Sequence, residues 1–179
     1  AVGPGNEEDA ENFIRLTSAL REAREDIFLN CTVGTWASPF WLQFADAIWR
    51  QDADWSTIGD QGNTRQRWIT YRDYMVYKNF TAASPLCPIN SLMTHGLMIS
   101  GFGNAGGNPP RAMEDDASAC TVAEITKEMR CAFACGSSLV ELYIDHELMT
   151  NKENGKLWRE LAECIKWHRN NADVLDDTH

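Results

Sequence analysis

The spacing of apolar side chains predicts how helices and strands alternate along this chain. Phe13, Leu16 and Leu20 recur at helical intervals behind an acidic first turn, which predicts a helix over residues 7–26. The same test applied to the rest of the chain predicts three further helices and four short apolar strands. Helices are expected at 65–80, 114–131 and 157–170, strands at 27–33, 44–49, 89–99 and 139–144, and loops at 59–63 and 101–110.

This alternation favours an α/β fold in which parallel strands are covered by helices. Four strands are too few for a closed (β/α)8 barrel, which typically takes about 250 residues. At 179 residues the chain is long enough for one substantial core, so residues 1–179 are expected to form a single domain with residues 1–8 as a flexible lead-in. An open sheet of four strands must bury its edges against something else.

Composition and charge exclude several classes of partner. The formal net charge is -10, which argues against nucleic acid, because phosphates call for basic patches. No apolar run approaches the roughly 18–20 residues needed to cross a bilayer, so no membrane partner is expected. The start of the chain lacks a basic-then-apolar signal segment, so any export signal is expected to be absent or already removed.

Neither a metal nor a cofactor is predicted. The six cysteines do not have zinc-site spacing, and His146, His168 and His179 do not cluster with acids at ligand spacing. The GFGNAGG segment at 101–107 lacks the lysine and the strand-then-helix setting of a phosphate-binding loop.

Candidate chemistry gathers in residues 35–73. Five of the seven tryptophans of the chain lie there, among several aspartates and arginines. Flat aromatic faces beside carboxylates and arginines suit a sugar ring, because the rings cover its apolar side and the polar groups take its hydroxyls. The alternative is a well-packed edge of the core with solvated charges between the rings, and the composition alone does not separate the two.

Two carboxylates stand out in this segment. Asp52 and Asp54 lie just past a candidate strand, between Trp49 and Trp55, and the end of a barrel strand is where catalytic residues occur. A semi-apolar pocket helps a carboxyl to hold its proton, as an acid/base must. The alternative is a solvated loop pair or a helix cap. Asp46 is expected within the strand, as a structural hydrogen-bonding residue.

Further residues are candidates for sugar binding. The fork of Arg50 or Arg65 suits sugar hydroxyls or a carboxylate. Arg65 and Arg67 cannot share a helix face, so at most one of them is expected to point inward. The full set of expected sugar-binding residues is Trp36, Trp49, Arg50, Trp55, Arg65, Asn90 and His95. For His95 a buried, hydrogen-bonded structural role is an equal alternative.

Four segments together resemble a known family. They are FLNCTVGTWASPFW at 28–41, ADAIWRQDADW at 45–55, PINSLMTHG at 88–96, and CGSSLVELYI at 135–144 followed by the closing segment 161–179. In this order they resemble the fifth to eighth strand segments of the α-galactosidase clan of glycoside hydrolases, and most closely its galactosidase-like barrels that often carry the label "enterotoxin".

The resemblance implies the second half of a (β/α)8 TIM-type barrel, with about four βα units. It implies retaining cleavage of α-galactoside-type sugars, with Asp52 or Asp54 as the acid/base. The family's nucleophile is an Asp that usually follows a Lys and an aromatic residue, and no such motif precedes Asp26. Position 51 is Gln where the family tends to have Ser, which leaves the choice between the two aspartates open.

These implications give three hypotheses for function. The first is a glycosidase-like half-barrel that is inactive or weakly active alone, because its nucleophile comes from a missing N-terminal half. The second is a non-catalytic carbohydrate-binding or assembly module, and the third is an unrelated α/β enzyme that uses Cys and His. The first predicts carbohydrate as ligand and either a homo-oligomer or a complementing half-barrel as partner. The resemblance favours an extracytoplasmic, periplasmic or secreted, location.

Overall fold

The described part of the chain is a mixed α/β structure built on one parallel sheet. The computed structural model describes residues 7–32, 38–53, 55–83, 87–99, 116–144 and 155–176. Its elements are α1 (Glu7–Ala23), β1 (Asn30–Cys31), η1 (Pro39–Gln43), β2 (Ala47–Trp49), α2 (Thr64–Val76), η2 (Tyr77–Thr81), η3 (Ile89–Ser91), β3 (Leu92–Ile99), η4 (Ala117–Cys120), α4 (Val122–Ala134), β4 (Leu139–Ile144), α6 (Gly155–Asn170) and α7 (Ala172–Leu175).

The four strands follow one another in the sheet in the order in which they occur in the chain. The order is β1-β2-β3-β4, and each neighbouring pair is parallel. Such a sheet needs a crossover after each strand, and right-handed crossovers that advance in one direction place every helix on the same face.

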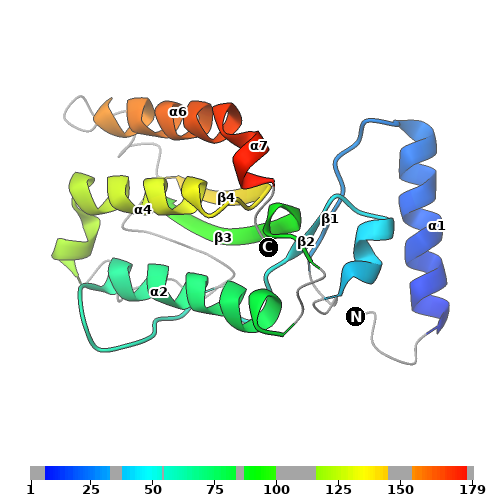
Figure 1. Cartoon of the computed structure of the whole chain (residues 1–179), viewed down its shortest axis with the longest axis horizontal. Helices are drawn as coiled ribbons and strands as arrows, with labels where there is room; N and C mark the ends of the chain where they lie inside the picture. The colour runs from blue at the N-terminus through cyan, green and yellow to red at the C-terminus, as the bar shows by residue number, and fades with distance from the viewer. Residues whose placement is uncertain are drawn as a thin grey trace.

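Side-chain packing places most contacts of the helices on one face. Ile48 on β2 and Leu92 on β3 are paired in register and belong to a core cluster that includes Val76 of α2. Val140 on β4 packs against the cluster formed by α4 and α6. Val140 is paired with Thr94, which lies two residues after Leu92 and so on the same face. Figure 1 shows α2, α4 and α6 side by side across the sheet, with α1 apart at the other end.

The other face of the sheet carries the side chains that alternate with these. We call the face that carries Ala47, Trp49 and Met93 the inner face. Asn30 Nδ2 on β1 lies 2.8 Å from Met93 Sδ on β3, across the intervening strand. The packing contacts of α4 and α6 lie on the opposite face, whereas Tyr143 of β4, which alternates with Leu142, packs against Trp68, Tyr71 and Met75 of α2.

A β-bulge interrupts the pairing of β3 with β4. Thr94 is paired with Val140 and Leu97 with Leu142, so β3 uses one more residue than β4 between these two pairs. The extra residue falls at His95–Gly96. Bulges are uncommon in parallel pairs and re-aim the strand locally. The bulge returns Leu97 to the helix-covered face, where it is fully buried against α4 and α6.

The start of α2 is tied to the start of α4. Asn63 caps α2 with a capping box, since its side chain accepts from Gln66 N and Gln66 Oε1 accepts from Asn63 N. Glu124 of α4 accepts from both of these side chains at 3.0 Å, and Asp116 accepts from the Thr64 amide at 2.8 Å. These bonds satisfy helix-terminal donors and fix the two crossover helices against one another.

The Asp116 contact predicts a dependence of stability on pH. Hydrogen bonds from Ser118 and then from Thr64 hold the pKa of Asp116 well below its usual range. A carboxyl whose pKa is lowered by folding contributes stability above its unfolded pKa of about 3.9, and this contribution is lost as the pH falls through the folded value. We therefore expect Asp116→Asn to unfold at a lower urea midpoint than wild type at pH 7, with the difference shrinking below about pH 4. Equal midpoints at pH 7 would contradict the stability assigned to the ionised carboxyl.

The four strands predicted from the sequence are all present, and the first two strands are shorter than predicted. The strand expected at 27–33 is reduced to Asn30–Cys31, and that at 44–49 to Ala47–Trp49. The helix expected at 114–131 instead begins at Val122, because Thr121 caps it by accepting from Glu124 N at 3.2 Å. The loop expected at 101–110 lies outside the described residues. The α/β class with parallel strands is confirmed, and the described sheet is an open one.

Candidate functional site

The segment that follows β2 has an unusual backbone. Gln51 and Asp52 adopt φ values of 72° and 68°, in the left-handed region. Asp tolerates this region better than most residues, whereas Gln has no such preference. Two consecutive residues of this kind persist only where the surrounding structure holds them, and they cluster at functional sites.

Three side chains hold this turn in place. Arg50 folds back and donates to the carbonyl oxygens of Gln51 and Ala53, at 2.8 and 2.9 Å. The Tyr71 hydroxyl accepts from the Ala53 amide at 3.1 Å, and Asn79 Nδ2 donates to the Arg50 carbonyl at the same distance. The Arg50 guanidinium is buried and lies over the rings of Trp68 and Tyr71. Burial lowers the pKa of Arg50, and the neighbouring Tyr71 opposes this.

The Asp52 carboxylate lies at the surface of this turn. Its side chain is 37% exposed. Asp52 Oδ2 accepts from Asn79 Nδ2 at 2.7 Å, and Lys78 Nζ lies 3.8 Å from the same oxygen. Both partners come from η2, a π-helical turn in which the Ala82 amide donates to the Tyr77 carbonyl. Such turns are rare and often occur at functional sites.

Asp52 does not lie level with the ends of β3 and β4. Trp49, the last residue of β2, is paired with Met93, the second residue of β3, and the Arg50 amide donates to the Met93 carbonyl. The strand β3 then runs on from Thr94 to Ile99. The expectation that Asp52 follows the carboxyl end of a strand is thus met for β2. Because β2 is short, Asp52 lies beside the first half of β3 and not at the level of its end.

The clustered tryptophans divide between core and surface. Trp41 and Trp68 are fully buried. Trp49 and Trp55 are partly exposed, and the Trp55 ring centroid lies 4.8 Å from that of Trp68. The alternative of core packing therefore holds for two of the five rings, while Trp49 lies on the inner face and Trp55 on the β2–α2 connection. Trp36 lies outside the described residues.

The structure gives several other predicted residues a structural position. Asn90 donates to Asp176 near α7. His95 lies at the β-bulge, and its side chain is outside the description, as is Asp54. Asp46 lies one residue before β2, not within it. It accepts from the Leu29 amide and from Arg21 at 2.7 Å, which matches its expected structural role.

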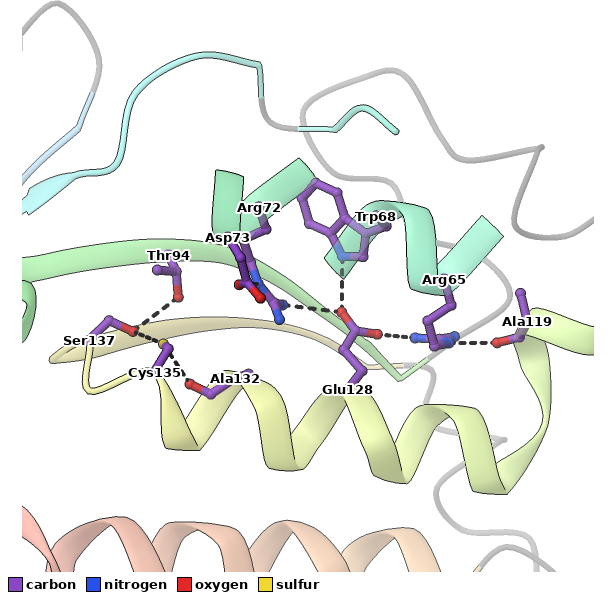
Figure 2. Close-up of polar contacts among 10 residues, drawn as sticks. All are labelled: Arg65, Trp68, Arg72, Asp73, Thr94, Ala119, Glu128, Ala132, Cys135 and Ser137. Atoms are coloured by element: carbon purple, nitrogen blue, oxygen red, sulfur yellow. Dashed lines mark hydrogen bonds and ion pairs between the residues drawn. The ribbon is translucent and has the colours of Figure 1, made fainter. Parts of the chain in front are cut away.

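Arg65 belongs to a buried ionic cluster that sequence reasoning missed. Glu128 of α4, fully buried, accepts from Arg65 Nη1, from Trp68 Nε1 at 2.9 Å and from Arg72 Nη1 at 3.3 Å. Arg65 Nε also donates to the Ala119 carbonyl at 2.5 Å. Figure 2 shows these side chains of α2 pointing toward Glu128 between the two helices. The i, i+3, i+7 spacing of the three donors on α2 is the signal that would have identified this face.

This cluster assigns Arg65 to the packing of α2 on α4. Arg65 is buried and Arg67 is partly exposed. Only Arg65 therefore points fully inward, as expected for two residues that cannot share a helix face. Its guanidinium has no exposure to solvent, so the geometry gives no support to direct sugar contact by Arg65.

In the described ranges, no three His, Cys, Asp or Glu side chains come together as a metal site would require. None of the helices described combines the length and apolar character of a membrane crossing. The six cysteines are free thiols.

Comparison with known proteins finds no match for this chain among protein-family models, curated proteins or solved structures.

Proposed function

We propose that this chain is half of a (β/α)8-type barrel of the glycoside hydrolase kind, and that it binds an α-galactoside-type sugar beside the turn that follows β2. The observation that carries the proposal is the order of the sheet. A parallel sheet whose strands advance in one direction, with its helices packed mainly on one face, fits a barrel segment, whereas doubly wound α/β sheets reverse their strand order and carry helices on both faces.

The site in this proposal combines Asp52 with the partly exposed rings of Trp49 and Trp55. An indole face covers the apolar side of the sugar, and either Asp52 or Asp54 reaches the glycosidic oxygen. If Asp52 is the acid/base, Oδ1 is the oxygen that delivers the proton, since Oδ2 accepts from Asn79. After the leaving group departs, the same oxygen takes a proton from the attacking water.

A retaining reaction also needs a carboxylate nucleophile about 5–5.5 Å from the acid/base. In this proposal the nucleophile comes from the complementing half of the barrel. The chain by itself is then expected to bind sugar and to hydrolyse aryl α-galactosides slowly or not at all.

Paired assays test this proposal. Calorimetric titration with galactose should show saturable binding, and aryl α-galactoside should release little phenol. Any turnover that does occur should fall by at least about a hundredfold in Asp52→Asn or in Asp54→Asn. Asp60→Asn, an exposed change in the same β2–α2 connection, serves as the control. Fast turnover that survives both active-site changes, or a complete lack of sugar binding, would refute the assignment.

One observation favours the second hypothesis, a carbohydrate-binding module without chemistry. Asp52 Oδ2 already faces an amide and an ammonium group, an arrangement that suits a carboxylate that orients a ligand. In that case Asp52→Asn weakens galactose binding and no turnover appears when an upstream half-barrel is supplied.

A further inference from the structure

The two ends of the sheet leave two unlike edges. In the described residues β1 pairs only with β2, and β4 pairs only with β3. The helix α1 flanks the first edge and α6 flanks the second (Figure 1). Unpaired strand edges invite pairing with another chain.

Both edges expose apolar side chains. On α1, Phe13 packs on Trp41 and Thr17 is buried, while Leu16 is 57% exposed. On α6, the side that faces α4 carries Glu160, Cys164 and Trp167. The opposite side of α6 lines a shallow surface hollow of about 320 Å³, whose residues are Ala162, Ile165, Lys166, Arg169 and Asn170.

The two flanking helices carry opposite charge. Helix α1 has five acidic and two basic side chains, which gives a net charge of -3. Helix α6 has four basic and two acidic side chains, which gives +2 with histidine neutral. If α1 of each copy faced α6 of the other copy, opposite charges would therefore attract at both contacts.

We propose that the α1/β1 edge of one copy docks on the β4/α6 edge of a second copy, so that two copies form a two-fold pair with eight parallel strands. In such a pair β4 runs beside the partner's β1, and the partner's β4 runs beside β1. A two-fold axis along the strands keeps every strand parallel and leaves no edge open. The proposal rests on the half-barrel character of the sheet argued above, and it concerns association alone.

Two charge-reversed chains test which edges meet. In one chain α6 is reversed by K166E/R169E, and in the other α1 is reversed by E8K/D9K. When either variant pairs with a second copy of itself, like charges face one another at both contacts. Mixed together, they restore one contact between unaltered edges and one between reversed edges.

Sedimentation velocity on the full chain gives the readout. Wild type should form dimers whose dissociation constant rises between about 0.02 M and about 0.5 M salt. Each reversed chain alone should dissociate at least about tenfold more readily, and the equimolar mixture should recover dimers. Circular dichroism of each variant confirms that its helices are intact.

Three results would overturn the proposal: a wild type that stays monomeric at all concentrations, oligomers that grow beyond two copies, or a mixture that fails to recover. These measurements contain no sugar, so their failure leaves the sugar-binding assays to decide the proposed function separately. Conversely, a dimer that binds no galactose would support this pairing and refute the proposed function.

Discussion

Glu128→Gln is expected to remove about 3–5 kcal/mol of the free energy of unfolding, the largest effect of any single change considered for this protein. The substitution keeps the shape of the side chain and removes its charge. Arg65 and Arg72 then remain buried with no carboxylate between them. An uncompensated buried charge is much more costly than the loss of an ordinary hydrogen bond.

The size of this loss is a large part of the stability of a typical domain, which is about 5–15 kcal/mol. Urea unfolding followed by fluorescence measures it, since Trp68 lies within the cluster. If the single variant does not fold, the triple variant Glu128→Leu, Arg65→Met, Arg72→Met keeps the prediction testable. Apolar groups of similar volume in place of a buried ionic cluster are expected to leave stability unchanged or to raise it by about 1–4 kcal/mol.

An exposed ion pair on neighbouring helices provides the matched control. Arg130 Nε lies 2.6 Å from Glu160 Oε1, between α4 and α6, and the Arg130 side chain is 66% exposed. Glu160→Gln should cost less than about 1 kcal/mol, because solvent screens this pair. Equal losses for Glu128→Gln and Glu160→Gln would contradict the account of the buried cluster.

Trp49→Ala is expected to weaken galactose binding by about 2 kcal/mol, roughly a thirtyfold rise in the dissociation constant. Trp49 is the partly exposed indole on the inner face, paired in register with Met93. Its loss removes the flat surface on which the apolar side of a sugar ring would rest. Calorimetry with galactose measures the change.

Trp167→Ala is the control for this prediction. Trp167 is 48% exposed on α6, on the helix-covered side of the sheet. Its removal should leave the affinity for galactose unchanged. A loss of affinity for Trp167→Ala that matched the loss for Trp49→Ala would place the sugar elsewhere or show that exposed indoles bind it without selectivity.

Much of the fold was predictable because the pattern of apolar residues is local. The strand at 139–144 and the helix near 157–170 were expected with nearly the bounds that they have. Pairing is not local, and so the reduction of the first strand to two residues could not be inferred from its apolar run. The bulge at His95–Gly96 depends on how β3 fits β4, which a single segment does not encode.

The site was less predictable for the same reason. Asp52 was identified by its position after an apolar run, but its backbone conformation and its contact with Asn79 depend on a π-helical turn further along the chain. The sequence predicts Arg65 as a sugar-binding residue, because its actual partner, Glu128, lies 63 residues further along the chain. Long-range partners of charged residues require the tertiary structure, which explains why the buried cluster was missed.

Indole signals in a nitrogen–proton correlation spectrum would report directly on sugar binding beside the turn after β2. The chain has seven tryptophans, so seven indole signals can be followed during titration with methyl α-galactoside. We expect the signals of Trp49 and Trp55 to shift together and to saturate with one dissociation constant, while those of Trp158 and Trp167 on α6 stay in place. Shifts confined to the α6 indoles, or no shift at the highest soluble sugar concentration, would contradict it.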